Sequence, residues 1–290
     1  MLQYHLGGFV KHIFLLKEDT SSDFRLEIER LATYYRMNYA IEIANMDKMK
    51  DIIHYYKDKN VVLYAVGGDG TLNFVLNEMI GGNATLGLIP TGTGNDFYRK
   101  VLEYPDTILD VNVMSVNNRY GLNIFSVGID AEICANAQKF KKFGPALAYN
   151  LSIFYTFFKY KCKNITVNDE KLEITLLSIC NGSYYGRGFA ISPNSDILSK
   201  NVFVYFVSEM QKLEMPSFLL DLLRTEHFYN PYVNVGFSER PIHIHSSSPL
   251  YGQLDGEEML DTDYIVDPKS TSVSFLNDKR FVRELIKNKI

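Results

Sequence analysis

The sequence predicts an N-terminal α/β domain with a doubly wound parallel sheet, followed by an antiparallel β-sandwich-like domain, and three features of its 290 residues support this. Strand and helix patterns alternate over residues 1–112, as in doubly wound folds. Residues 113–276 hold short alternating strands separated by turn residues, as in sandwiches. A short basic helix pattern at 277–290 follows and would complete the first domain.

Hydrophobic periodicity defines the elements of the first domain. Four apolar runs predict strands at 9–16, 39–44, 61–66 and 85–90. Between them, apolar residues at helical spacing predict three helices, which begin near Ser22 or Asp23, near Met46 and near Leu72. The run VVLYAV at 61–66 is apolar throughout, as expected of a parallel strand covered on both faces. Gly81 and Gly82 would end the third helix.

Short strands and turn residues dominate the second domain. The predicted strands lie in NRYGLNIFSVGI, KNITVN, KLEITLLSICNG, NVFVYFVSEM, PYVNVGF, RPIHIHS and DYIVD. Two helical patterns interrupt them, one at 133–159 with a break at Gly144–Pro145 and one at 216–226. The second domain is therefore expected to be mainly β, and we assign substrate binding to it.

Composition excludes several classes of protein. The net charge of −4 and the pI near 5.9 predict no nucleic-acid partner, so any contact with phosphate or lipid must be local. Three widely spaced cysteines fit neither a disulfide framework nor a metal motif. The N-terminus does not resemble a signal peptide, and the aromatic-rich run at 146–158 is too short to span a bilayer. We expect a cytoplasmic protein without a transmembrane segment.

Two glycine-rich loops follow consecutive predicted strands. The first is GGDGT (Gly67 to Thr71) and the second lies in PTGTGNDF (Pro90 to Phe97). Loops at the carboxyl ends of neighbouring parallel strands lie side by side, where glycine backbone and helix N–H groups bind phosphate. Asp69 would repel phosphate unless Mg²⁺ lay between them; the alternative is that Asp69 caps a helix. Neither a Walker P-loop nor a G-x-G-x-x-G motif is present.

These loops supply the predicted nucleotide-phosphate ligands. They are Gly67, Gly68, Asp69, Gly70, Thr71, Thr91, Gly92, Thr93, Gly94 and Asn95. A third motif, Asp255-Gly256-Glu257, comes late in the β domain and by itself is typical of a hairpin turn.

The order GGDGT, PTGTGND and DGE resembles the diacylglycerol kinase catalytic-domain family. The soluble bacterial lipid kinases are the most similar branch, and sphingosine and ceramide kinases are more distant relatives. The resemblance extends over residues 9–267, and SVGIDAEI (126–133) and CNGSYYGRGFAISPNSD (180–196) are also similar to family segments.

The resemblance implies phosphorylation of a lipid hydroxyl by ATP with Mg²⁺, the nucleotide lying between the domains. Diacylglycerol, converted to phosphatidic acid, is the leading acceptor, reached by transient association with a membrane surface. The implied catalytic residues are Asp69, Asp255 and Glu257, with Asp255 favoured as the base. Asp69 would hold the metal, joined by Asp130 or Glu132. Whether the protein is a monomer or a homodimer stays open.

Two segments depart from the family pattern. LLKEDTSSD (15–23) lacks the usual Asn-Pro and glycine after the first strand, and NSDILSKNVFVY (194–205) replaces an acidic stretch that holds a structural metal in some relatives. We therefore expect no second metal. The departures leave a non-catalytic nucleotide or lipid sensor as one alternative. An NAD kinase is the other, because that family shares GGDGT but has a different second loop.

Three surface features allow two interpretations each. One aromatic set either forms a lipid-facing lip or packs into the core, namely Tyr149, Phe154, Tyr155, Phe157, Phe158 and Tyr160. Lys139, Lys141 and Lys142 either meet anionic headgroups or form a solvated turn. His243 and His245 share a strand face, which suits either a metal site or a solvent-facing strand.

Overall fold

The computed structural model describes residues 10–287, apart from the side chains at 145, 146, 149 and 150. Its described residues form two compact units: one from residues 10–111 and 272–287, the other from Asn112–Thr271. Each unit has its own hydrophobic core. Among the described residues, no helix has the length and apolar character needed to cross a bilayer.

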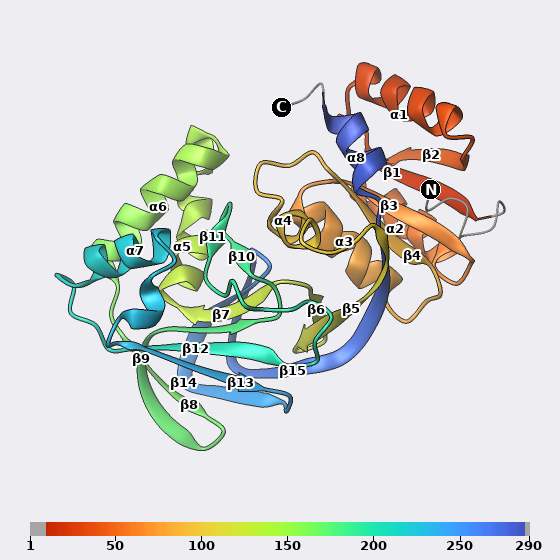
Figure 1. The fold of residues 1–290 in the computed structure, drawn as a ribbon. Coiled ribbons are helices and arrows are strands. Elements are labelled where there is room, and N and C mark those ends of the chain that lie inside the picture. Colours follow the sequence, from red (N-terminus) through yellow and green to blue (C-terminus); the bar gives the residue numbers. More distant parts are fainter. Residues whose placement is uncertain (1–9, 288–290) are drawn as a thin grey trace. The chain divides into compact units, whose positions relative to one another are not determined.

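The first unit is built on a parallel sheet (Figure 1). Its strands are β1 (Lys11–Lys17), β2 (Asn38–Ala44), β3 (Val61–Gly67) and β4 (Thr85–Pro90). They pair in the order β4-β3-β1-β2, and every pair is parallel. The last residues of β15 (Glu257–Asn277) add to β4 in the same direction. The predicted parallel sheet is confirmed.

Helices cover this sheet because the strands are apolar on both faces. They are α1 (Ser22–Tyr34), α2 (Met46–Tyr56), α3 (Asp69–Met79), α4 (Asp96–Val101) and α8 (Lys279–Ile286). The inner faces of α1 and α8 pack with β1 and β3 in one cluster, in which the Phe14 ring stacks on Tyr64 at 4.8 Å. The cap of α1 is Ser21, whose hydroxyl accepts the Phe24 N–H at 3.4 Å, and the helix begins at Ser22, as predicted.

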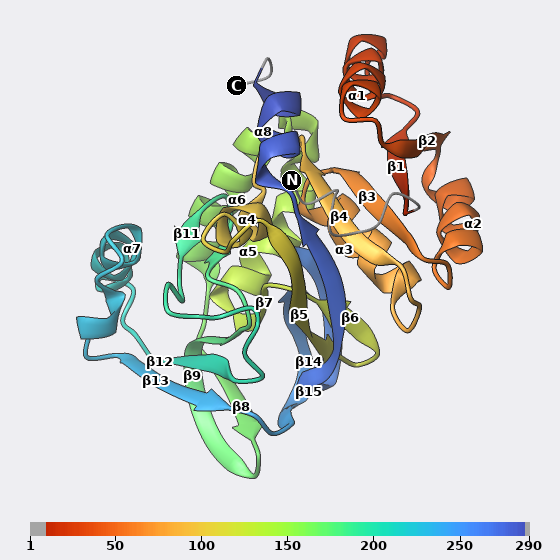
Figure 2. The ribbon, with the colours of Figure 1, turned by 45° about the vertical axis from the view of Figure 1, so that its right-hand side comes forward.

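The second unit is antiparallel and curls on itself. Its strands are β5 (Thr107–Val116), whose first residues belong to the first unit, β6 (Arg119–Gly121), β7 (Ile124–Gly128), β8 (Lys163–Val167), β9 (Glu170–Cys180), β10 (Tyr184–Tyr185), β11 (Phe189–Ala190), β12 (Val202–Ser208), β13 (Val233–Ser238), β14 (Ile242–Leu254) and most of β15. Strand β14 pairs with β7 through one part and with β8 through another, while β9 also pairs with both. This pairing encloses a core of apolar side chains. Strands β14 and β15 lie side by side in both views (Figures 1 and 2).

The helices of the second unit are α5 (Ile129–Ala137), α6 (Pro145–Lys159) and α7 (Met215–Leu223). The predicted break at Gly144–Pro145 is confirmed, but the helical region starts at Ile129 rather than 133. Gly128 precedes this start with φ 110°, which a residue with a side chain rarely adopts. Strand β5 was not predicted as a strand, because it spans the change of pattern near residue 112.

Candidate active site

The two glycine-rich loops lie next to each other in the first unit. Strands β3 and β4 pair so that Gly67 is opposite Pro90, which places both loops at the same edge of the sheet. The Thr91 N–H donates a hydrogen bond of 2.9 Å to the Gly67 carbonyl. The adjacency predicted from the sequence is confirmed; nucleotide binding by Gly70, Thr93, Gly94 and the other loop residues stays a prediction.

Close packing between the loops requires glycine. A Cβ added to Gly92 would lie 2.5 Å from the Gly68 Cα, and one added to Gly67 would lie 2.3 Å from the Thr71 hydroxyl oxygen. Thr71 is itself buried. The sequence explained these glycines by the approach of phosphate; the structure adds that the loops contact each other through backbone atoms at Gly68 and Gly92.

We expect the substitution Gly92→Ala to separate the loops. Overpacking against backbone should lower the free energy of unfolding by about 1–3 kcal/mol and weaken ATP binding at least several-fold. Thermal unfolding and calorimetric titration with ATP–Mg²⁺ measure both effects. Gly236→Ala in β13 is the matched control, because an added Cβ there has no atom within 4 Å. Equal unfolding temperatures for the two variants would contradict the packing argument.

Asp69 is the first residue of α3, and its carboxylate reaches the second loop. Its Oδ1 accepts the Phe97 N–H at 3.3 Å, so it caps the first turn of α4 rather than its own helix. The described residues donate no other hydrogen bond to this half-buried carboxylate. The capping alternative is thus present in the structure, and it leaves one carboxylate oxygen for another ligand.

Asn95 closes the second loop in a left-handed conformation, with φ 54°. Its Nδ2 donates to the Gly92 carbonyl at 2.8 Å, which fixes the orientation of the amide. Its Oδ1 is buried and has no hydrogen-bond partner among the described residues. A buried acceptor without a donor is costly, so this atom suits a donor or a cation carried by a ligand.

The oxygen atoms of Asp69 and Asn95 fit Mg²⁺ by type. This ion binds through one or two carboxylates, retained waters and substrate phosphates, and it seldom needs a cage made of protein alone. In the described chain no group of three or more His, Cys, Asp or Glu side chains could hold a metal ion. A metal held here would therefore depend on phosphate oxygens of the nucleotide.

The second unit supplies the carboxylates of the DGE motif. Asp255 and Gly256 form the turn between β14 and β15, with φ of 51° and 88°, as in a two-residue hairpin. The Asp255 carboxylate accepts three backbone N–H groups, from Leu122 at 2.7 Å, Asn123 at 3.0 Å and Ile124 at 2.9 Å. Asp255 therefore anchors the start of β7. The Glu257 side chain is exposed and has no hydrogen bond or ion pair within the described residues.

Asp130 is connected to the same turn through two side chains. The Ser126 hydroxyl donates to Asp130, the Gln253 amide donates to Ser126 at 2.7 Å, and the Gly256 N–H donates to Gln253 at 2.7 Å. Burial raises the pKa of Asp130 to about 6. The sequence singled out neither Ser126 nor Gln253 as a site residue, although each lies beside a motif.

Glu132 contacts β8 instead of the turn at Asp255–Gly256. Its carboxylate pairs with the Lys163 ammonium at 2.5 Å, and within the described residues it makes no hydrogen bond or ion pair with the turn. The sequence left Asp130 and Glu132 as equal candidates for the metal. The structure brings Asp130 into the hydrogen-bonded chain that leads to Gly256 and places Glu132 against β8.

The buried Asp130 predicts a pH-dependent stability. Because its pKa rises from 3.8 to about 6 on folding, the folded protein keeps a proton that the unfolded chain releases in this range. Stability should fall as the pH rises from 3.8 to about 6 and then level off, at a cost on the order of 3 kcal/mol. Asp130→Asn should remove this dependence and be more stable than the wild type at neutral pH, as measured by urea unfolding across pH.

The control for Asp130→Asn is Asp263→Asn, which should act in the opposite direction. A hydrogen bond with His245 lowers the pKa of Asp263, so its contribution is present at neutral pH and is lost on acidification. Equal changes in the stability of the wild type and of Asp130→Asn between pH 4 and pH 6 would contradict the Asp130 prediction.

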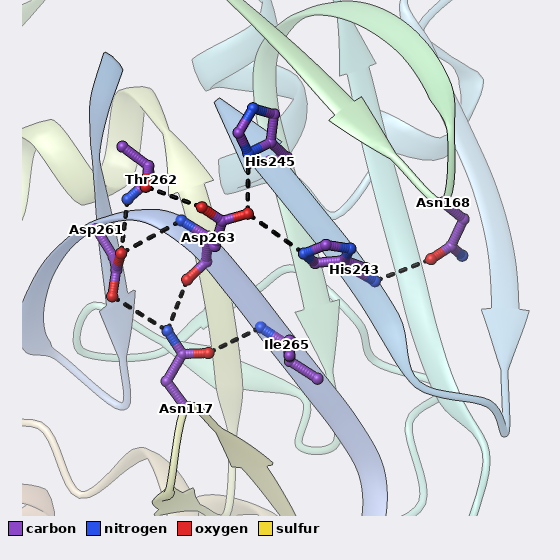
Figure 3. A network of polar contacts seen from close by, with 8 residues as sticks. All are labelled: Asn117, Asn168, His243, His245, Asp261, Thr262, Asp263 and Ile265. Atoms are coloured by element: carbon purple, nitrogen blue, oxygen red, sulfur yellow. Dashed lines mark hydrogen bonds and ion pairs between the residues drawn. The ribbon is translucent and has the colours of Figure 1, made fainter. Parts of the chain in front are cut away.

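His243 and His245 point to the same carboxylate (Figure 3). Asp263 on β15 lies 2.8 Å from His245 Nδ1 and 3.4 Å from His243 Nε2. Both rings are about half exposed, with side-chain exposures of 57% and 52%. Asn117 binds the same strand, donating to the Asp263 carbonyl at 2.6 Å. Both rings face solvent, as one of the two interpretations expected, and both lie next to the Asp263 carboxylate.

The family can now be assigned. Residues 18–119 match the model of the diacylglycerol kinase catalytic domain. Residues 123–273 match the model described as the YegS C-terminal NAD kinase beta sandwich-like domain. The chain belongs to the diacylglycerol kinase catalytic-domain family. The family resemblance and the two-part fold predicted from the sequence are both confirmed, and the chain is kinase-like at the level of the family.

The chain is similar in sequence to two named bacterial proteins and in fold to a solved structure. It is 27% identical over 218 residues to the protein named diacylglycerol kinase in Bacillus subtilis, covering 68% of this chain and 71% of that protein. It is 26% identical over 226 residues to a provisionally named lipid kinase of Staphylococcus carnosus, covering 69% of this chain and 72% of that protein. A crystal structure from Bacillus anthracis, provisionally named a diacylglycerol kinase, superposes with a TM-score of 0.72 at 18% identity over 94% of this chain and 97% of the other. That likeness supports the fold.

Proposed function

We propose that this kinase-family chain transfers the γ-phosphate of ATP to a lipid hydroxyl, with diacylglycerol as the leading acceptor. The observation that carries the proposal is the pair of adjacent loops, in which Asp69 bridges to the second loop and Asn95 presents a buried acceptor without a partner. Phosphoryl transfer depends mainly on positioning the phosphates and on neutralising their charge. The two loops could position the phosphates, and Mg²⁺ bound at Asp69 and Asn95 could neutralise their charge. The named relatives are kinases of lipids, which supports the choice of acceptor class.

The residues of the first unit would hold the donor. Backbone N–H groups at the start of α3 suit the phosphates, because Gly68 offers the helix no side-chain cap. Asp69 and Asn95 would hold Mg²⁺, which when bound neutralises phosphate charge. The loop contacts at Gly68 and Gly92 would keep these groups in a fixed arrangement.

The residues of the second unit would act on the acceptor. A carboxylate of the Asp255–Glu257 turn would take the proton from the lipid hydroxyl as its oxygen bonds to the γ-phosphorus. The bond from that phosphorus to the bridging oxygen would break, and ADP would leave. Asp255 accepts backbone N–H groups on both of its carboxylate oxygens, whereas the exposed Glu257 carboxylate has no hydrogen bond or ion pair in the described chain. We therefore assign Asp255 to positioning of the turn and keep both residues as candidates for the base.

The deciding experiment measures transfer of labelled γ-phosphate from ATP–Mg²⁺ into dispersed diacylglycerol and other lipid alcohols, with NAD as a parallel acceptor. Label in a lipid is the expected result. Label in NAD alone would show that the acceptor is NAD and that the lipid assignment is wrong. ATP that binds without transfer to any acceptor would identify a sensor. The altered first loop (residues 15–23) would then be the leading explanation for the lack of transfer, since the Ser21 hydroxyl already accepts the Phe24 N–H as the cap of α1.

A further inference from the structure

Helix α6 exposes its large apolar residues. Leu147, Phe154 and Phe158 are 50%, 66% and 71% exposed, and Leu151 between them is half-buried. Their spacing places all four on one side of the helix, and we call this set the outer stripe. Soluble proteins seldom expose a continuous apolar surface without a binding role.

The buried side of α6 carries few large apolar side chains. Its most buried members are small or carry hydroxyl groups: Ala148, Ser152 and Thr156. The Thr156 hydroxyl accepts a hydrogen bond of 2.9 Å from the Asn136 amide on the segment of α5. Only Phe157 among the phenylalanines of α6 packs against the core of the unit. Among the described residues, small and hydroxyl-bearing side chains and Phe157 therefore attach the helix to the fold, whereas the outer stripe is exposed.

Positive charge surrounds the outer stripe. Residues 138–163 contain six lysines and no acidic residue, in a chain where Asp and Glu outnumber Lys and Arg by 34 to 30. Three of these lysines precede α6 and three lie at or beyond its end: Lys139, Lys141, Lys142, Lys159, Lys161 and Lys163. Within the described residues, only Lys163 among them forms an ion pair.

The segment before α7 extends this surface. Lys212 donates to the Phe158 carbonyl at 2.8 Å, which ties the approach to α7 to the end of α6. Next to it, Leu213 is 90% exposed. On α7 itself, Leu220 and Leu223 are 52% and 56% exposed. Apolar side chains and a further lysine thus continue from α6 into the neighbouring segment.

We propose that the outer stripe and its flanking lysines dock the protein onto an anionic lipid bilayer. An apolar face flanked by lysines is the pattern of helices that lie in the membrane interface, where anionic headgroups attract the charges. A second copy of this face would bring two sets of lysines together without acidic residues between them, which disfavours a symmetric dimer through it. This inference rests on the proposed function, because it identifies the face through which a lipid kinase would reach its membrane-bound acceptor.

The test is flotation of the full chain, without ATP, with phosphatidylcholine vesicles that contain or lack phosphatidylglycerol. Binding to the anionic vesicles is expected. The double variant Phe154→Ser/Phe158→Ser should reduce the partition coefficient at least about tenfold at an unchanged unfolding temperature. Its matched control is Phe237→Ser on β13, because Phe237 is 75% exposed. Lys141→Glu/Lys142→Glu should weaken binding to anionic vesicles, whereas Lys171→Glu on β9 should not.

Three results would overturn the docking surface. One is a wild-type chain that does not float with anionic vesicles. Another is a double serine variant that binds as well as the wild type. The third is a double variant that only converts an oligomer to a monomer, which would identify an interface between copies. Because vesicle binding needs no phosphate transfer, a chain that binds through the stripe but phosphorylates no acceptor would refute the proposed function and leave the docking surface standing.

Discussion

Asp69→Asn should lower the rate of phosphate transfer by about 10²–10³ while the protein remains folded. The amide oxygen of asparagine can still accept the Phe97 N–H that the carboxylate binds at 3.3 Å, so the link between the loops survives. What is lost is the negative charge that would hold Mg²⁺ next to the phosphates. Steady-state transfer of labelled phosphate and thermal unfolding together separate these two effects.

Asp47→Asn provides the matched control for Asp69→Asn. Asp47 lies in the first turn of α2, the helix of the preceding βα unit, and it is exposed. The same chemical change at that position should leave transfer and stability unaltered. If Asp69→Asn transfers phosphate as fast as Asp47→Asn, the metal role of Asp69 is wrong and the carboxylate serves only as the cap of α4.

Asp255→Asn should lower both stability and the rate of transfer, whereas Glu257→Gln should lower only the rate. Asparagine at 255 keeps the size of the side chain but replaces one acceptor oxygen with a donor that faces backbone N–H groups of Leu122 to Ile124. We expect a loss of stability of about 2 kcal/mol or more, together with loss of transfer. Glu257→Gln, at an exposed position without partners among the described residues, should lower only the rate, by about 10²–10³.

The rates of the two variants then identify the base. If Glu257 takes the hydroxyl proton, Glu257→Gln should lower the rate of transfer at an unchanged unfolding temperature. A Glu257→Gln enzyme with the wild-type rate would exclude Glu257 and return the role to Asp255. Glu258→Gln is the control, because this exposed neighbour is not part of the DGE motif.

Much of the first unit was predictable because its signals are local. The apolar runs of β1, β3 and β4 and the glycine loops that follow β3 and β4 each lie within a few consecutive residues. Parallel pairing then places the loops together without further information. The break before α6 was equally local, since it depends on Gly144–Pro145. The boundaries that were missed, at α5 and β5, fall where two patterns overlap.

The roles of individual carboxylates were not predictable in the same way. Asp130 and Glu132 are equivalent in the sequence, yet one contacts Ser126 and the other contacts Lys163. Asp255 looks like a free catalytic carboxylate, but its oxygens accept N–H groups from residues more than 130 positions earlier in the chain. Phe154 and Phe157 read alike as aromatic residues, and only one of them is in the core.

The sequence by itself determined the two-part architecture, the family, and the position of the glycine-rich loops at the ends of β3 and β4, because periodicity and turn chemistry act over a few residues. The tertiary structure decided which glycines are needed for contact between loops, which carboxylates are held by backbone, and which side of α6 faces solvent. These depend on partners far apart in the chain, and the partners are fixed only when the strands and helices pack.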